Sequence, residues 1–214
     1  MRHLLAQPAR FIACHLLLLH AAVAYFPVYA QPAKPKLQLS VQAGPVIFDE
    51  IYQFAPASRY SISSSARVRK NCHAVLRFGF IPATQKFVTP AGAQTAEVNL
   101  YELAVGVKLD GPALFTSHLR AFGSLMGGVL LYRPQPAKLD LGVGGMVRMQ
   151  PPNSTKGLFS AALGLDWQLA KAVALSIAVD ASLSRIAERL TDGTARQRWR
   201  PIFSAAVGIC GSIK

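Results

Sequence analysis

The sequence predicts an all-β protein, an eight-stranded antiparallel up-and-down transmembrane β-barrel. The first observation is a strict alternation of apolar with small or polar residues along several segments, the period of a β-strand. The second is composition: AVILMFWYC residues make up 51% of the chain and DEKR residues only 15%, against roughly 25% charged residues in soluble proteins. The third is that the connections between these segments alternate between long and short. Together these features indicate a barrel whose outer surface faces lipid.

Residues 1–30 have the pattern of a secretory signal peptide. Arg2 and Arg10 precede an apolar run over residues 11–26, and Ala30 is a small residue at the expected cleavage position. The predicted organisation is therefore a signal peptide over residues 1–30 and a barrel over 31–214. An uncleaved membrane anchor is the alternative for the first segment.

The alternation is clearest over residues 172–185, where Val173, Leu175, Ile177 and Val179 alternate with alanine, serine or aspartate. The expected strands are 37–42, 60–69, 73–81, 101–109, 119–131, 159–167, 172–185 and 200–211. A transmembrane strand needs only about 9–11 residues, whereas a transmembrane helix needs roughly twenty. The longest stretch of the mature chain without a charged residue, 201–213, is thirteen residues long and so favours strands.

The connections alternate in length around the predicted barrel. The long ones are 49–59, 82–96, 132–156 and 186–199, and the short ones are 70–72, 110–116 and 168–171. Short periplasmic turns that alternate with longer outer loops are typical of outer-membrane barrels. Within the longest connection, residues 139–149 could form a further hairpin, and ten strands result if that hairpin crosses the membrane.

The face of each strand that carries small residues is expected to line the lumen. The charged residues on it form a predicted lumen polar network: Arg77, Glu102, Lys108, Arg120, Asp166 and Asp180. Buried charges must be paired, so these acids and bases should meet across the interior. The interior of eight strands is filled by side chains, which makes a porin-like pore a less favoured alternative.

Aromatic residues near the strand ends predict an interfacial girdle. Tyr60, Tyr132 and Trp199 lie at expected outer ends, and Trp167 lies near an expected periplasmic end. Such rings favour the lipid–water interface because one end is apolar and the other polar.

The net charge of +13 is strongly basic. Export from the cytoplasm argues against nucleic acid as a partner, so the expected partners are outer-membrane lipid and lipopolysaccharide. The sequence does not identify the ligand of the outer loops. We expect a monomer. The mature chain keeps Cys72 and Cys210. Export permits a disulfide, but the two cysteines lie in segments that are not neighbours, which favours free thiols without deciding their redox state.

No catalytic, cofactor or metal-binding motif stands out. The only histidines of the mature chain, His73 and His118, have no partner ligands nearby in the sequence. Ser117 and His118 are adjacent on a strand and point to opposite faces, so they do not form a nucleophile–base pair. We therefore expect no enzyme, with a lipid-modifying barrel enzyme as one alternative. A soluble barrel that binds a small ligand is another, and it requires the apolar face to point inward.

Two stretches resemble the OmpA-like outer-membrane β-barrel domain family. They are RAFGSLMGGVLLYRP, 120–134, and TKGLFSAALGLDWQLAKAVALSIAVDASLSR, 155–185, and RPIFSAAVGI, 200–209, is similar to a closing strand of that type. The chain departs from the family in ending on Gly-Ser-Ile-Lys instead of an aromatic residue. The resemblance implies a barrel fold and a membrane, and no activity. We expect the outer membrane of a Gram-negative bacterium as the location, a structural or adhesive role in which the outer loops make the contacts, and no cofactor.

Overall fold

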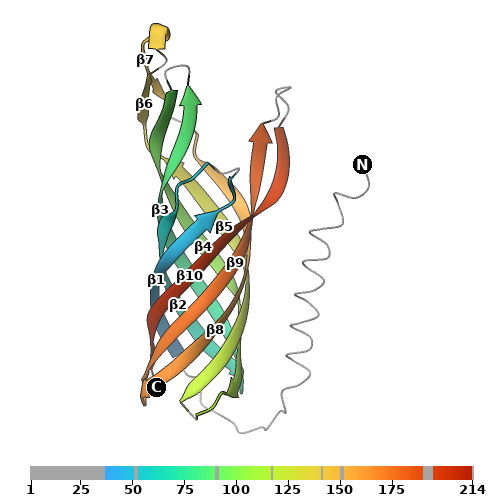
Figure 1. The fold of residues 1–214 in the computed structure, drawn as a ribbon. Helices are drawn as coiled ribbons and strands as arrows, with labels where there is room; N and C mark the ends of the chain where they lie inside the picture. Colours follow the sequence, from blue (N-terminus) through green and yellow to red (C-terminus); the bar gives the residue numbers. More distant parts are fainter. Residues whose placement is uncertain are drawn as a thin grey trace. The chain divides into compact units, whose positions relative to one another are not determined.

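A computed structural model of the chain describes residues 37–50, 53–89, 92–116, 118–140, 142–149, 152–189 and 195–213. The expected signal peptide, residues 1–30, and Ser117 lie outside the described residues. The barrel strands are β1 (Leu37–Phe48), β2 (Ala57–Arg69), β3 (Cys72–Thr89), β4 (Gly92–Ala113), β5 (Leu119–Pro134), β8 (Ser154–Ala170), β9 (Val173–Arg189) and β10 (Ala195–Ile213). Figure 1 shows them winding around a common axis.

The eight strands form one closed antiparallel barrel in the order β1-β10-β9-β8-β5-β4-β3-β2. The ring closes between the first and last strands, where Leu37 pairs with Ile213. Because the barrel is closed, no strand has an unpaired edge. In apolar surroundings every backbone N–H and C=O group needs a hydrogen-bond partner within the protein, and a closed barrel provides it. The predicted fold is thus confirmed.

The segment that could have added two strands forms a separate hairpin. β6 (Ala137–Asp140) and β7 (Met146–Met149) pair only with each other, and a short 3-10 turn, η2 (Gly142–Gly144), joins them. The hairpin projects beyond one end of the barrel (Figure 1), which we call the outer end. The barrel therefore has eight strands and not ten.

Two of the expected long loops prove to be strand extensions. β3 and β4 remain paired as far as Thr89 and Gly92, and β9 and β10 remain paired as far as Arg189 and Ala195. The sequence of these segments lacks the period-two pattern of the predicted strands. The backbone ladder nevertheless continues, because its hydrogen bonds do not depend on side-chain polarity.

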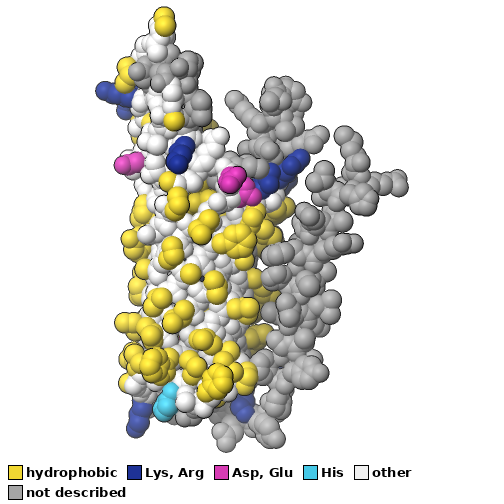
Figure 2. Space-filling model, in the orientation of Figure 1, with side chains coloured by type: hydrophobic (Ala, Val, Ile, Leu, Met, Phe, Trp, Pro, Cys, Tyr) yellow, Lys and Arg dark blue, Asp and Glu magenta, His cyan; other side chains and the backbone are white. Residues whose placement is uncertain are grey.

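The outward face of the barrel is an apolar belt. Large apolar side chains are exposed on it, including Leu103, Leu163 and Val179, of which Leu163 is 70% exposed. Figure 2 shows apolar side chains covering the visible face between charged side chains at both ends. Among the described residues, no helix is long and apolar enough to cross a membrane.

The inward face is polar in the middle of the barrel and apolar towards the outer end. The buried apolar cluster there comprises Val46, Phe48, Ile81, Ala83, Val98, Leu100, Leu130 and Ile202. Phe54, on the connection between β1 and β2, packs against this cluster and forms an isolated bridge with Gln85. The small residues expected along the inward faces did not predict an apolar cluster there.

Candidate functional site in the barrel lumen

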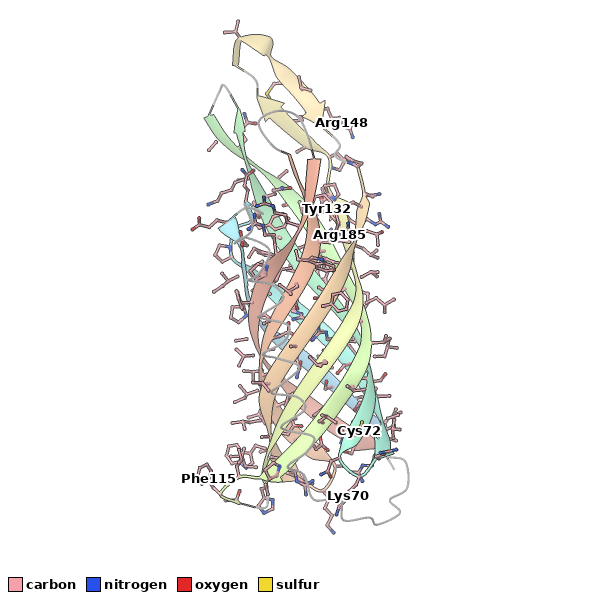
Figure 3. All side chains as sticks on the ribbon, turned by 90° about the vertical axis from the view of Figure 1, so that its right-hand side faces the viewer. Lys70, Cys72, Phe115, Tyr132, Arg148 and Arg185 are labelled. Carbon is pink, nitrogen blue, oxygen red and sulfur yellow. The ribbon has the colours of Figure 1, made fainter. Side chains whose placement is uncertain are left out.

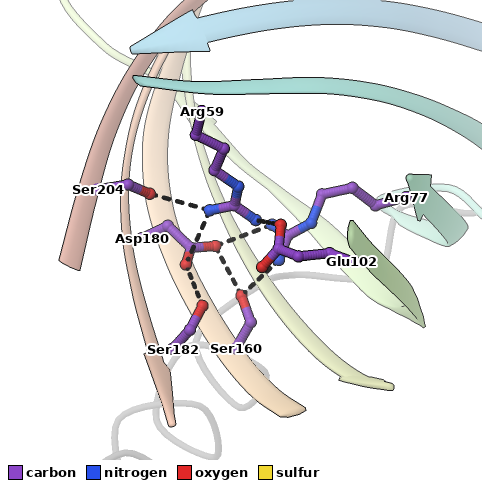
Figure 4. Close-up of polar contacts among 7 residues, drawn as sticks. All are labelled: Arg59, Arg77, Glu102, Ser160, Asp180, Ser182 and Ser204. Carbon is purple, nitrogen blue, oxygen red and sulfur yellow. Dashed lines mark hydrogen bonds and ion pairs between the residues drawn. The ribbon is translucent and has the colours of Figure 1, made fainter. Parts of the chain in front are cut away.

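A layer of charged side chains spans the lumen, centred on Asp180 of β9 (Figure 4). Its carboxylate accepts hydrogen bonds from Ser160 Oγ at 2.6 Å and from Ser182 Oγ at 2.6 Å. Arg77 Nη1 lies 2.8 Å from Asp180 Oδ2, and Arg77 Nη2 donates to Ser160 Oγ at 3.0 Å. Asp180 is thus held by partners from β3, β8 and β9, so this one carboxylate links three strands.

Arg59 of β2 completes the charged layer. Its guanidinium lies 2.5 Å from Glu102 Oε2 and 3.3 Å from Asp180 Oδ1, and it donates to Ser204 Oγ at 2.9 Å. Two arginines and two carboxylates then balance in charge, as buried ions require. The sequence prediction paired Glu102 with other bases and missed Arg59, which lay at the edge of an expected loop. Its register with the inward Ser61 and Ser65 was the available signal.

A second ion pair lies nearer the end of the barrel opposite the outer end. Lys108 Nζ is 2.5 Å from Asp166 Oδ2 and 4.1 Å from the centre of the Phe122 ring. The expected meeting of Lys108 with an acid from across the lumen is therefore found. Beyond it, the fully buried His73 places Nε2 2.9 Å from Asp110 Oδ2.

Arg120 is exposed and is absent from these lumen contacts among the described residues, contrary to the prediction. It is the second residue of β5. A long side chain at the rim of a barrel can reach water instead of entering the lumen, and solvation there is more favourable than burial.

Between the two ionic layers lies a cavity of about 70 Å³. Its lining includes Arg59, Arg77 and Asp180 on one side and Lys108, Phe122 and Cys210 on the other, with serines between them. One water needs about 10–15 Å³ of such space, so the cavity has room for several. The Nε atoms of Arg59 and Arg77 are buried without a hydrogen-bond partner in the described part of the chain, and water in the cavity could satisfy them.

The lumen is closed towards the outer end by aromatic packing above the charged layer. The rings of Phe48 and Phe54 meet edge to face with centres 4.9 Å apart, and Phe54 and Tyr132 stack at 6.5 Å. The Tyr132 hydroxyl donates to Gln85 Oε1 at 2.6 Å. Tyr132 therefore points into the barrel mouth, and its prediction as a girdle residue is wrong. It shares the inward register of Met126 and Leu130 on β5.

The other three predicted girdle aromatics do lie on the outward face. Tyr60, Trp167 and Trp199 are 51%, 54% and 41% exposed. Trp167 lies near the end of β8 opposite the outer end of the barrel, and Trp199 lies near the outer end of β10.

The lumen chemistry is that of an ion-paired interior. Ser160 and Ser182 donate to a carboxylate, and the described residues place no histidine beside them. Within the described ranges, no group of three or more His, Cys, Asp or Glu side chains could hold a metal ion. Cys72 and Cys210 are free thiols on β3 and β10, which β1 and β2 separate in the barrel order.

Comparison with known proteins supports the fold. No family model matches the chain, and no curated protein matches its sequence. Among solved structures, the outer membrane protein OprG from Pseudomonas aeruginosa is similar at a TM-score of 0.55 and 10% identity, over 87% of this chain and 99% of that one. Neisserial surface protein A is similar at a TM-score of 0.51 and 12% identity, over 83% of this chain and 96% of that one. The chain thus shares the fold of these barrels.

Proposed function

We propose that this chain is a non-enzymatic outer-membrane β-barrel of the OmpA-like type, in which the barrel anchors outer hairpins that make the functional contacts. The observation that carries the proposal is the apolar belt on the outward face, from Leu39 and Val41 on β1 to Phe203 and Val207 on β10. Such a belt exposed to water all around a barrel would favour aggregation, whereas lipid solvates it.

The distribution of charge supports lipid and not water as the surrounding medium. The ion pairs of Arg59, Arg77 and Lys108 lie inside the barrel, while the middle of the outward face is apolar. A soluble ligand-binding barrel requires the reverse arrangement. The likeness to OprG, a protein named for the outer membrane, supports the same location.

The closed lumen supports a structural or adhesive role over a porin-like one. The apolar cluster and the layer around Asp180 both lie between the cavity and the outer end. In this proposal the contacts are made by the projecting hairpins β3–β4, β6–β7 and β9–β10 (Figure 1). We propose outer-membrane lipid and lipopolysaccharide as its neighbours, a monomer as its state, and no cofactor.

The proposal is tested by expressing the full chain in a Gram-negative host and fractionating the envelope. Folded barrels resist sodium dodecyl sulfate until boiled, so the outer-membrane fraction should contain a band whose mobility changes on boiling. A chain that begins at residue 31 is the control and should fail to reach this fraction. A periplasmic band, soluble without detergent and unchanged by boiling, would overturn the proposal.

A further inference from the structure

Arg185 lies at the outer edge of the apolar belt with its side chain exposed. It follows the inward Ser182 and Ser184 in register and therefore points outward from β9. Trp199 of β10 pairs with Arg185, and Leu158 of β8 pairs with Ser184. Arg185 thus stands between Trp199 and Gly157, the residue before Leu158. Figure 3 shows it near the level of Tyr132, well short of Arg148 on the projecting hairpin.

The ring of Trp199 is held in place across β9. It lies over Gly157, whose absent side chain leaves room for the indole. The ring of Phe159, one outward position below Gly157, has its centre 5.3 Å from that of Trp199. Two aromatic rings at the edge of the apolar belt therefore pack together beside the strand position that carries the exposed Arg185.

Positive charge dominates the described side chains at this end of the barrel. Its exposed basic side chains are Lys86, Arg133, Lys138, Arg148, Arg185 and Arg198, whereas its exposed acids are Glu50 and Glu97. The acids at the middle of the barrel are buried in ion pairs and contribute little outside. No ion pair of Arg185 is found among the described residues, so its charge is open to a ligand from the surrounding membrane.

We propose that Arg185 and Trp199 form a binding site for the phosphate-bearing headgroup of an outer-leaflet glycolipid, an inference that rests on the proposed membrane location. The guanidinium binds phosphate oxygens in a bidentate manner. The indole, held over Gly157, packs against the sugar–acyl boundary, where amphipathic rings are favoured. The belt sets the height of the site, because the acyl chains of the same lipid lie against Phe159 and Leu163.

The test uses Trp199 as the reporter. Trp167 and Trp199 are the two tryptophans of the chain, so Trp167→Phe leaves one emitting indole, at the outer end. This variant is folded into phosphatidylcholine vesicles that contain increasing fractions of bisphosphorylated lipid A, and the emission of Trp199 is recorded. Dephosphorylated lipid A with the same acyl chains is the lipid control. Arg185→Gln is the test variant, and Arg148→Gln, on the β6–β7 hairpin, is the matched control.

Phosphorylated lipid A should shift the emission, whereas dephosphorylated lipid A should not. Arg185→Gln should require about a fivefold higher lipid fraction, which corresponds to the roughly 1 kcal/mol that one basic residue gains at an anionic surface. Arg148→Gln should titrate like the parent. Equal titration of Arg185→Gln, an equal loss in Arg148→Gln, or an equal response to both lipids would each overturn the site. If Arg185→Gln does not fold, the test of the site is the comparison between phosphorylated and dephosphorylated lipid A.

Boiling-dependent gel mobility of the same vesicles separates this inference from the proposed function. If the barrel folds into vesicles but its emission does not respond to the lipid phosphate, only the proposed lipid site is contradicted. A chain that never acquires a boiling-sensitive mobility in any vesicle contradicts the membrane barrel itself.

Discussion

Glu102 reaches Arg59 by lying over Gly79. Gly79 pairs with Glu102 across the β3–β4 ladder and with Ser61 across the β2–β3 ladder, so it stands between the two charged side chains. A Cβ atom on Gly79 would overlap the Glu102 carboxylate. The ion pair that joins β2 to β4 therefore depends on a missing side chain on the strand between them.

Gly79→Ala should break this ion pair and destabilise the barrel by about 3 kcal/mol, because separating a buried pair leaves an uncompensated charge. The measurement is urea unfolding in lipid vesicles, followed by tryptophan fluorescence. Gly127→Ala is the control, since a Cβ there would meet Phe159 at an ordinary 3.6 Å. In a Glu102→Ala background the cost of Gly79→Ala should be much smaller, and additive costs would refute the coupling.

Leu163→Arg should destabilise the membrane-embedded barrel strongly. Leu163 lies at the middle of β8 on the outward face, where arginine at the bilayer midplane costs about 2–4 kcal/mol. Val147→Arg is the matched control on the β7 hairpin strand, which projects beyond the barrel, and should change stability by less than about 0.5 kcal/mol. Unfolding in vesicles measures both. Equal effects would mean that the outward belt does not face lipid.

The sequence was sufficient for the barrel because a lipid-facing strand has a strict period of two. Glu102 and Lys108 of β4 were assigned correctly to the inward face by that period, and the residues between them, such as Leu103 and Val105, lie on the outward face. The same rule would have turned Tyr132 inward, since it shares the register of Leu130. Tyr132 was instead assigned to the interfacial girdle because it lies near the end of an expected strand, and that assignment was wrong.

Pairings across the lumen could not be deduced in the same way. Arg59 and Glu102 lie on strands that are not hydrogen-bonded to each other, so their contact depends on the stagger of three strands and on the space above Gly79. The period-two pattern of a sequence specifies neither this stagger nor this space. The outer extensions of β3, β4, β9 and β10 were likewise missed as strands, because their sequences lack the period-two pattern, whereas the β6–β7 hairpin was anticipated within residues 139–149.

Tyr132→Phe should loosen the cover of the barrel mouth while preserving its packing. The phenyl ring keeps its stacking on Phe54, but Gln85 Oε1 loses its donor at 2.6 Å. The expected cost is about 0.5–1.5 kcal/mol, the net contribution of one hydrogen bond. Hydrogen exchange of the Ala55 amide, which donates to Thr84 O, should quicken. Tyr60→Phe, on the exposed outer face, is the control and should leave that exchange unchanged.

Gly44→Ala should weaken the closure of the barrel. The β1–β10 ladder is interrupted between the pairs Ala43–Val207 and Val46–Ser204, and within this gap a Cβ on Gly44 would overlap the carbonyl of Ala205. Pro45, which follows, has no N–H with which to restore the ladder. Forcing the strands apart should cost about 1–3 kcal/mol and lower the fraction of protein that runs as the folded, unboiled band. Gly211→Ala tests the same strand pair where a Cβ would lie 3.9 Å from its nearest neighbour. It should fold like the parent, and a similar loss in both variants would show that the two strands tolerate no added methyl group anywhere along their contact.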